Sequence, residues 1–149
     1  MRIFLLVIVT AWLAACASTG GDAPYPEAQQ IIDRIAAEHS DLVRLTLHAV
    51  PAGKTRCTQL ASTMPERRGR PSDPEDLDAM RTGKEIVLDE KGAIDVTVPI
   101  LEMGGKPTAV AGVTLRDDAV ADRNVLVQRA KTIAGDLASA VKAADKPLW

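Results

Sequence analysis

Strict alternation of apolar and polar residues in two segments constrains this chain most strongly, because a period of two fits only a β-strand with one apolar face. The first segment runs from Leu42 to Val50 and the second from Ala93 to Leu101. Weaker strand patterns, separated by turn residues, predict three more strands over Arg56–Ser62, Glu85–Asp89 and Thr108–Leu115. The sequence therefore predicts a five-stranded antiparallel sheet whose first two strands form a hairpin.

Three segments have the spacing of helices. Glu27–His39 and Ala119–Ala144 place apolar side chains at intervals of three and four, which indicates a long amphipathic helix at each end of the domain. Between the second and third strands, Asp73 is suited to cap a short helix that begins at Pro74 and stops before Gly83. Helices gathered on the apolar side of an antiparallel sheet give a single domain of the α+β class.

The N-terminal residues are typical of a bacterial lipoprotein. An apolar run of about 11 residues, Ile3 to Leu13, follows Arg2 and is too short to span a membrane. The run ends in Leu-Ala-Ala-Cys16, which resembles the lipobox, where the cysteine receives a diacylglyceryl group before cleavage. An ordinary signal peptide with an incidental cysteine is the alternative. We expect a signal peptide over residues 1–15, a lipid on Cys16, a flexible tether over 16–26 and one domain over 27–149.

A lipid on Cys16 would make the membrane the first expected partner. It predicts a periplasm-facing protein of the bacterial cell envelope, and Ala17, which is not Asp, slightly favours the outer membrane. Several acyl chains give near-permanent anchoring, whereas a single chain binds reversibly.

The composition excludes several classes of ligand. The formal net charge of -2, without a concentrated basic surface, argues against a nucleic-acid partner. Phe4 and Trp12 lie in the expected signal peptide, and Tyr25 and Trp149 lie near the ends of the rest. The domain therefore lacks aromatic platforms for sugars, bases or quaternary amines. Two histidines and one thiol at unsuitable spacings predict no metal site, and no motif predicts a cofactor.

Cys57 is the most nucleophilic side chain of the expected domain. With Cys16 lipidated it has no disulfide partner, so we expect it to be buried or free. Strand parity groups Cys57 with Gln59 and Ala61 on the apolar side, away from His48 across the hairpin. This geometry argues against a thiol enzyme, and we expect a protein without catalytic activity.

The polar face of the predicted sheet is the candidate binding site. A neighbouring loop carries three arginines, and together the face and the loop are suited to a small anion or carboxylate. The alternative is that the face and the loop are merely solvated. The candidate residues are Arg44, Thr46, His48, Arg56, Thr58, Ser62, Arg67, Arg68, Arg70, Asp95 and Thr97.

Turn and cap residues across the middle of the chain resemble those of the extracytoplasmic PAS-like sensor domains known as Cache domains. The similarity spans roughly Leu42 to Leu115. It implies a PAS-like sheet and a covering loop that enclose a small-molecule pocket. The residues that carry it are Leu60-Ala-Ser-Thr63, Arg68 to Leu77, Thr82-Gly-Lys84, Val98-Pro-Ile100 and Gly105-Lys-Pro107.

These observations predict a lipid-anchored, non-enzymatic domain that binds a small ligand or a partner protein of the envelope. Two alternatives remain open. One is a structural or interaction lipoprotein without a ligand pocket, whose sheet face docks directly onto an envelope protein. The other is a thiol enzyme that uses Cys57.

Overall fold

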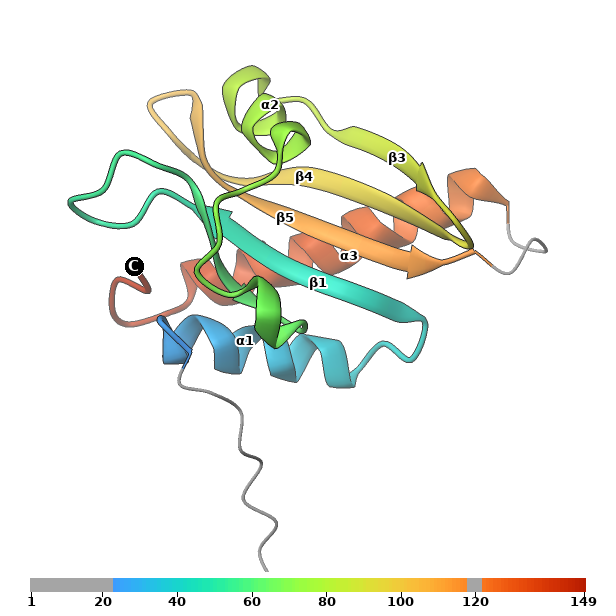
Figure 1. The fold of residues 1–149 in the computed structure, drawn as a ribbon, viewed down its shortest axis with the longest axis horizontal. Helices are drawn as coiled ribbons and strands as arrows, with labels where there is room; N and C mark the ends of the chain where they lie inside the picture. Colours follow the sequence, from blue (N-terminus) through green and yellow to red (C-terminus); the bar gives the residue numbers. More distant parts are fainter. Residues whose placement is uncertain (1–22, 118–121) are drawn as a thin grey trace, which may run out of the picture.

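The computed structural model describes residues 23–117 and 122–149 (Figure 1). The expected signal peptide, Cys16 and the tether up to residue 22 lie outside the described residues. The elements, in chain order, are α1 (Pro26–Ala37), β1 (Leu42–Ala49), β2 (Thr58–Ser62), the 3-10 helix η1 (Pro65–Arg67), α2 (Pro74–Thr82), β3 (Ile86–Glu90), β4 (Ala93–Met103), β5 (Lys106–Arg116) and α3 (Arg123–Lys142).

The strands form one antiparallel sheet in the order β2-β1-β5-β4-β3. This confirms the predicted α+β class and all five predicted strands. The turn between β4 and β5 is tighter than predicted, because Gly104 and Gly105 both adopt positive φ angles, 60° and 75°, and reverse the chain alone. Lys106 and Pro107 therefore belong to β5. Pro107 lies beyond Ala109, the last β5 residue paired with β1, so its missing N–H interrupts no bond to that strand.

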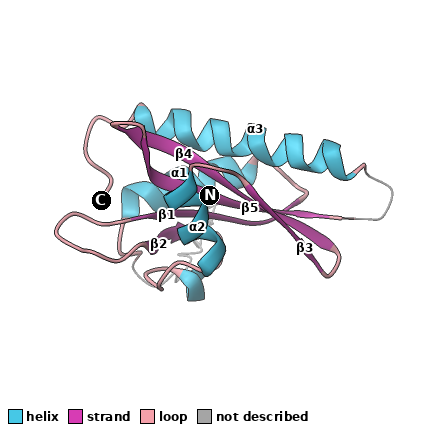
Figure 2. Ribbon diagram, turned by 90° about the horizontal axis from the view of Figure 1, so that it is seen from above, coloured by secondary structure: helices cyan, strands magenta, loops and turns pink. Residues whose placement is uncertain are grey.

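Helices cover both faces of the sheet, so the expectation that they all gather on its apolar side is wrong for α2. The two long helices, α1 and α3, pack on one face, and α2 packs on the other over β4 and β5 (Figure 2). The core between the long helices and the sheet is aliphatic, because its fully buried side chains include Ile32, Leu45, Leu47, Ile133 and Leu137. Burying such a side chain contributes about 1.5–3 kcal/mol.

The sequence signals of α2 are confirmed. Asp73 occupies the N-cap position, Pro74 opens the helix, and Gly83 follows its end with φ at 70°. The helix ends at Thr82, so it stops before Gly83 as predicted. Its short length and polar surface mean that its position depends on a few specific contacts with the sheet.

The hairpin of β1 and β2 differs from the prediction. Leu47 pairs with Ala61, but His48 pairs with Gln59, so Leu60 is an extra residue in β2. Because of this bulge, each residue before Leu60 faces the opposite side of the sheet from the one that simple alternation predicts. The prediction that Gln59 and Cys57 lie on the apolar side is therefore wrong, and both belong to the face of His48.

Two further residues depart from the predicted pattern. Val43, expected on the apolar face, is 44% exposed because the register with β5 shifts between Leu42 and Arg44. Arg56 is not part of β2, which begins at Thr58, and its side chain is exposed in the preceding loop.

Candidate functional site

The second face of the sheet is polar but buried. Thr46 and His48 of β1 and Asp95 and Thr97 of β4 are each at most 5% exposed, because α2 and the loop before it cover them. We call the space between them the polar chamber; it is lined by Arg44, Thr46, His48, Arg67, Asp73, Glu75, Asp76, Asp95 and Gly112. Its volume of about 10 Å³ is barely enough for one water molecule, so the protein's own side chains nearly fill it.

Asp76 joins α2 to the sheet. Its Oδ2 accepts a hydrogen bond from the Asp73 N–H at 2.9 Å and lies 3.1 Å from His48 Nδ1. Its Oδ1 accepts a hydrogen bond from the Thr97 hydroxyl at 3.3 Å. Burial raises the pKa of this carboxyl to about 7, so the side chain is mostly neutral below that pH. The same residue thus closes the first turn of α2 and fixes the helix to β1 and β4.

His48 is held in its neutral form. Burial lowers its pKa to about 3, because the interior disfavours the imidazolium. Its Nδ1 lies 3.0 Å from the Ser72 hydroxyl, which itself donates to the Cys57 sulfur at 3.1 Å. The Ser72 oxygen therefore accepts from His48, which places the imidazole proton on Nδ1. Between about pH 3 and 7, His48 and Asp76 are therefore a neutral pair, 3.1 Å apart, rather than an ion pair.

Gly112 of β5 gives His48 its space. A Cβ atom at this position would lie 3.3 Å from His48 Nε2 and 4.0 Å from Asp76 Oδ1. The imidazole therefore packs directly over the backbone of β5, and a glycine in this central strand serves the close approach of a side chain.

Arg44 forms a second polar cluster, at one end of the chamber. Its guanidinium lies 3.1 Å from Glu90 Oε1 and 3.2 Å from Asp95 Oδ1. Asp95 also accepts a hydrogen bond from the buried Thr114 hydroxyl. Burial lowers the pKa of Arg44, but the two acids outweigh this and leave it raised. The cation is thus already neutralised by the protein.

The arginines of the loop are likewise engaged. Arg67 donates to Asp73 at 3.0 Å across the chamber rim, and Arg68 Nε donates to the Ser62 carbonyl at 3.0 Å. Ser62 lies at the far end of β2, where its hydroxyl meets that of Thr46 at 2.9 Å. The loop is therefore folded against the sheet rather than simply solvated.

Cys57 is a free thiol, as predicted, and it is 7% exposed. It lies outside the hydrophobic cluster of the core and forms the end of the chain of contacts from Asp76 through His48 and Ser72. Burial raises the pKa of the thiol, which keeps it protonated at neutral pH. A covered, protonated thiol is a poor nucleophile, and Ser72 separates it from the imidazole.

The structure brings part of the predicted site together. The chamber contains Arg44, Thr46, His48, Asp95 and Thr97, with Arg67 at its rim. Three other predicted residues lie outside the chamber, on loops: Arg56, Arg68 and Arg70. Ser62, the last residue of β2, does not line the chamber either, although its hydroxyl contacts that of Thr46. Thr58 is also outside, since it lines a separate cavity of about 490 Å³ with Arg56.

Sequence reasoning missed three residues that shape the chamber, Asp76, Ser72 and Gly112. Asp76 has one signal in the sequence, since an acid three residues after an N-cap often closes a capping box. That signal accounts for a helix start but not for the contacts with His48 and Thr97.

The described residues include neither a metal-binding cluster nor a helix that could span a membrane. Residues 23–117 and 122–149 contain no group of three or more histidines, cysteines and acids placed to hold a metal ion. Within the same ranges, no helix has both the length and the apolar character required to cross a membrane.

The fold is similar to solved GAF domains. A GAF domain/HD domain protein from Geobacter sulfurreducens superimposes with a TM-score of 0.53 at 9% identity, covering 78% of this chain and 90% of that one. The GAF domain region of a Geobacter sulfurreducens PCA protein gives a TM-score of 0.52 at 15% identity, covering 78% and 91%. At these identities the likeness shows a shared GAF-like fold. No model of a known family matches the sequence, and no curated protein matches it.

Proposed function

We propose that this protein is a lipid-anchored sensor domain of the bacterial cell envelope, held at the membrane through Cys16, which binds a small polar ligand in the polar chamber. The main support for this proposal is the set of buried polar side chains between α2 and the sheet. The fold is GAF-like, and domains of this type often sense small ligands. The resemblance to Cache domains belongs to the same proposal. Fold alone does not fix function, so the site residues carry the argument.

The charges around the chamber favour a ligand with hydrogen-bond donors over a simple anion. Both arginines of the lining, Arg44 and Arg67, are already paired with acids, and His48 is neutral. The four acids of the lining outnumber the two arginines. A carboxylate would bind only by replacing an acid at Arg44 or at Arg67. We therefore propose a small amine as the ligand class.

One buried acceptor supports a ligand beside His48. Gln59, 2% exposed and paired with His48 across the hairpin, donates to the Pro71 carbonyl, but its Oε1 has no hydrogen-bond partner among the described residues. An unsatisfied buried acceptor costs about 1–3 kcal/mol. A ligand that donates to it would recover this free energy.

Entry of the ligand requires α2 to move. The chamber is too small for anything larger than a water molecule, whereas α2 buries only Asp76 and Ala79. Leu77 on the same helix is 47% exposed. The helix therefore rests on few apolar contacts, and elements with few buried contacts open at a lower free energy than the core.

Thermal-shift measurements with amines, amino acids, carboxylates and neutral polyols test the ligand. A ligand at ~100 times its Kd adds about 2.7 kcal/mol to the free energy of unfolding, or roughly 10 °C for a domain of this size. Thr46→Val and Thr97→Val keep the side-chain volume and remove a hydroxyl, so each should weaken the shift. Thr132→Val, on the exposed side of α3, is the matched control. The absence of a shift with all four classes would sink the ligand proposal.

The second candidate is an interaction lipoprotein without a pocket, which the nearly filled chamber favours. Hydrogen–deuterium exchange separates the two functions. Amides of α2 that exchange much faster than those of β5 would show the opening that a ligand needs. Equal protection of both elements would favour the interaction lipoprotein, whose partner is an envelope protein.

The anchor has its own test. Cells that produce the protein in the presence of labelled palmitate should incorporate the label, and Cys16→Ser should lose both the label and the membrane fraction. Cys57→Ser is the matched control and should retain both. Label on the Cys16→Ser protein would refute the anchor.

A further inference from the structure

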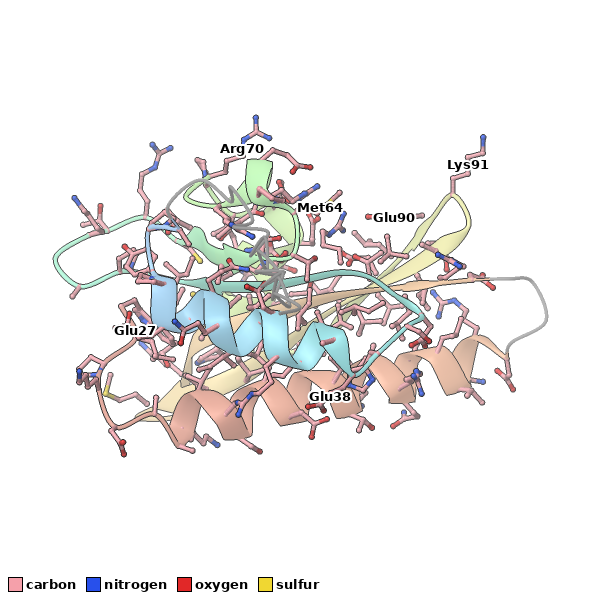
Figure 3. All side chains as sticks on the ribbon, turned by 90° about the horizontal axis from the view of Figure 1, so that it is seen from below. Glu27, Glu38, Met64, Arg70, Glu90 and Lys91 are labelled. Atoms are coloured by element: carbon pink, nitrogen blue, oxygen red, sulfur yellow. The ribbon has the colours of Figure 1, made fainter. Side chains whose placement is uncertain are left out.

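Exposed positive charge surrounds the start of the described chain. Lys54 and Arg56 lie in the loop between β1 and β2, and Arg70 projects outward from the loop between η1 and α2 (Figure 3). All three side chains are exposed, and none forms an ion pair with any residue in the ranges 23–117 and 122–149. We call these three residues the basic rim. The exposed acid closest to Arg70 in sequence is Glu66 of η1.

The basic rim lies beside the N-terminal segment. Pro24 and Tyr25 line the cavity of about 490 Å³ together with Lys54 and Arg56. Gly69, which precedes Arg70, lines it too, and a Cβ atom on Gly69 would lie 3.6 Å from Pro24 Cγ. The two loops that carry the rim thus meet where the chain continues toward Cys16.

The length of that connection limits how far the rim can lie from a bilayer. Cys16 precedes Pro24 by eight positions in the sequence. Eight residues span at most roughly 28 Å even when fully extended. Electrostatic attraction at physiological salt decays over about 8 Å. A lipid on Cys16 would therefore let the rim touch the headgroups, and the attraction acts once the rim is within about 8 Å of them.

We propose that the basic rim binds the anionic phospholipid surface in which the protein is anchored, and so fixes the orientation of the domain on the membrane. The inference rests on the proposed lipid anchor. Each cation near an anionic surface biases contact by roughly fivefold. The formal net charge of the chain is -2, so the chain as a whole is not attracted to an anionic surface and contact depends on where its cations lie. Tyr25, half-buried at the same end, suits a membrane interface.

Acetylation of the intact lipoprotein in vesicles measures this orientation. The protein is reconstituted into neutral phosphatidylcholine vesicles or vesicles that also contain phosphatidylglycerol, and each exposed lysine is quantified by mass spectrometry. Lys54 reports on the rim. Lys91, in the turn between β3 and β4 at the end opposite Glu27, is the internal reference (Figure 3). We expect the Lys54 to Lys91 ratio to fall roughly fivefold or more with phosphatidylglycerol, and to recover at high salt.

Paired charge variants give the control. Arg56→Gln with Arg70→Gln removes two charges from the rim and should restore most of the Lys54 signal. Arg34→Gln with Arg116→Gln removes two exposed arginines located elsewhere and should leave Lys54 protected. Both double variants change the net charge equally, so a difference between them reports on position.

The outcomes separate this inference from the anchor. Failure of the protein to float with either type of vesicle would refute the anchor itself. Flotation with both, but equal acetylation of Lys54 in both, would overturn the orienting role of the rim. Protection in neutral vesicles on addition of inorganic phosphate alone would also overturn it, because the rim would then bind a free anion.

Discussion

Asp76 and His48 make opposite contributions to the pH dependence of stability, and single substitutions should separate them. The native carboxyl of Asp76 keeps its proton up to about pH 7, whereas the unfolded one loses it near 3.8, so this residue lowers stability as pH rises between those values. Unfolded His48 binds a proton below about 6.5 and the native one only near 3, so it raises stability with pH. Both side chains are at most 5% exposed, so solvent screens them little.

The two effects share the window from about pH 4.5 to 6.5 and nearly cancel there. Each is worth about 1.4 kcal/mol per pH unit for one proton. Asparagine resembles the protonated carboxyl, so Asp76→Asn removes only the contribution that lowers stability as pH rises. Its stability relative to wild type should therefore rise by about 3 kcal/mol across the window. His48→Asn keeps a donor near the position of Nδ1 and should show a fall of similar size.

Urea unfolding at several pH values measures both differences, and other titrating groups cancel in the comparison with wild type. Absolute stabilities of the variants are not needed, because the packing change at either site does not depend on pH. A difference between Asp76→Asn and wild type that stays constant from pH 4.5 to 6.5 would refute the neutral pair. A charged Asp76 carboxylate beside a neutral imidazole would give that result, because the native pair would then hold no proton in this range.

Three further substitutions and one labelling reaction test the local geometry. Gly112→Ala should destabilise the protein by about 1–3 kcal/mol in urea unfolding, because the new methyl group presses on His48. Gly135→Ala on α3 meets nothing within 4 Å and should stabilise it by about 0.5–1 kcal/mol; equal effects at the two sites would contradict this packing. Gly83→Ala should cost roughly 1 kcal/mol, because φ is 70° there, and a neutral result would argue against the left-handed cap. Cys57 should react with iodoacetamide only slowly until denaturant is added, and rapid native labelling would contradict its burial and raised pKa.

Local signals in the sequence were sufficient for most of the fold. The alternation in β1 and β4 reflects one apolar face directly, and the signals around α2 act within a few residues of chain. The bulge in β2 was not predictable in this way. Leu60 and Ala61 are both apolar and both reach the core, so the sequence there contains no sign that the parity changes between them.

Only the part of the candidate site that the sheet contributes was predictable from the sequence. Thr46, His48 and Thr97 follow from the alternation of their strands. Their partners do not, because the position of α2 over β4 and β5 depends on contacts between residues far apart in the chain. Thr97 and Asp76, for example, are 21 positions apart. The pairing of Arg44 with two acids was not predictable from the sequence either. Because of this pairing, we propose a ligand that donates hydrogen bonds in place of the small anion that the sequence suggests.

The nearly filled polar chamber has a consequence for kinetics. If the ligand enters only after α2 has left the sheet, the rate of binding cannot exceed the rate of that departure. In a stopped-flow experiment the observed rate would then level off as the ligand concentration rises, at a value set by the protein alone. Because Asp76 fixes α2 and loses its proton near pH 7, that plateau would itself change with pH. The response time of such a sensor would be a property of one short helix rather than of the abundance of its ligand.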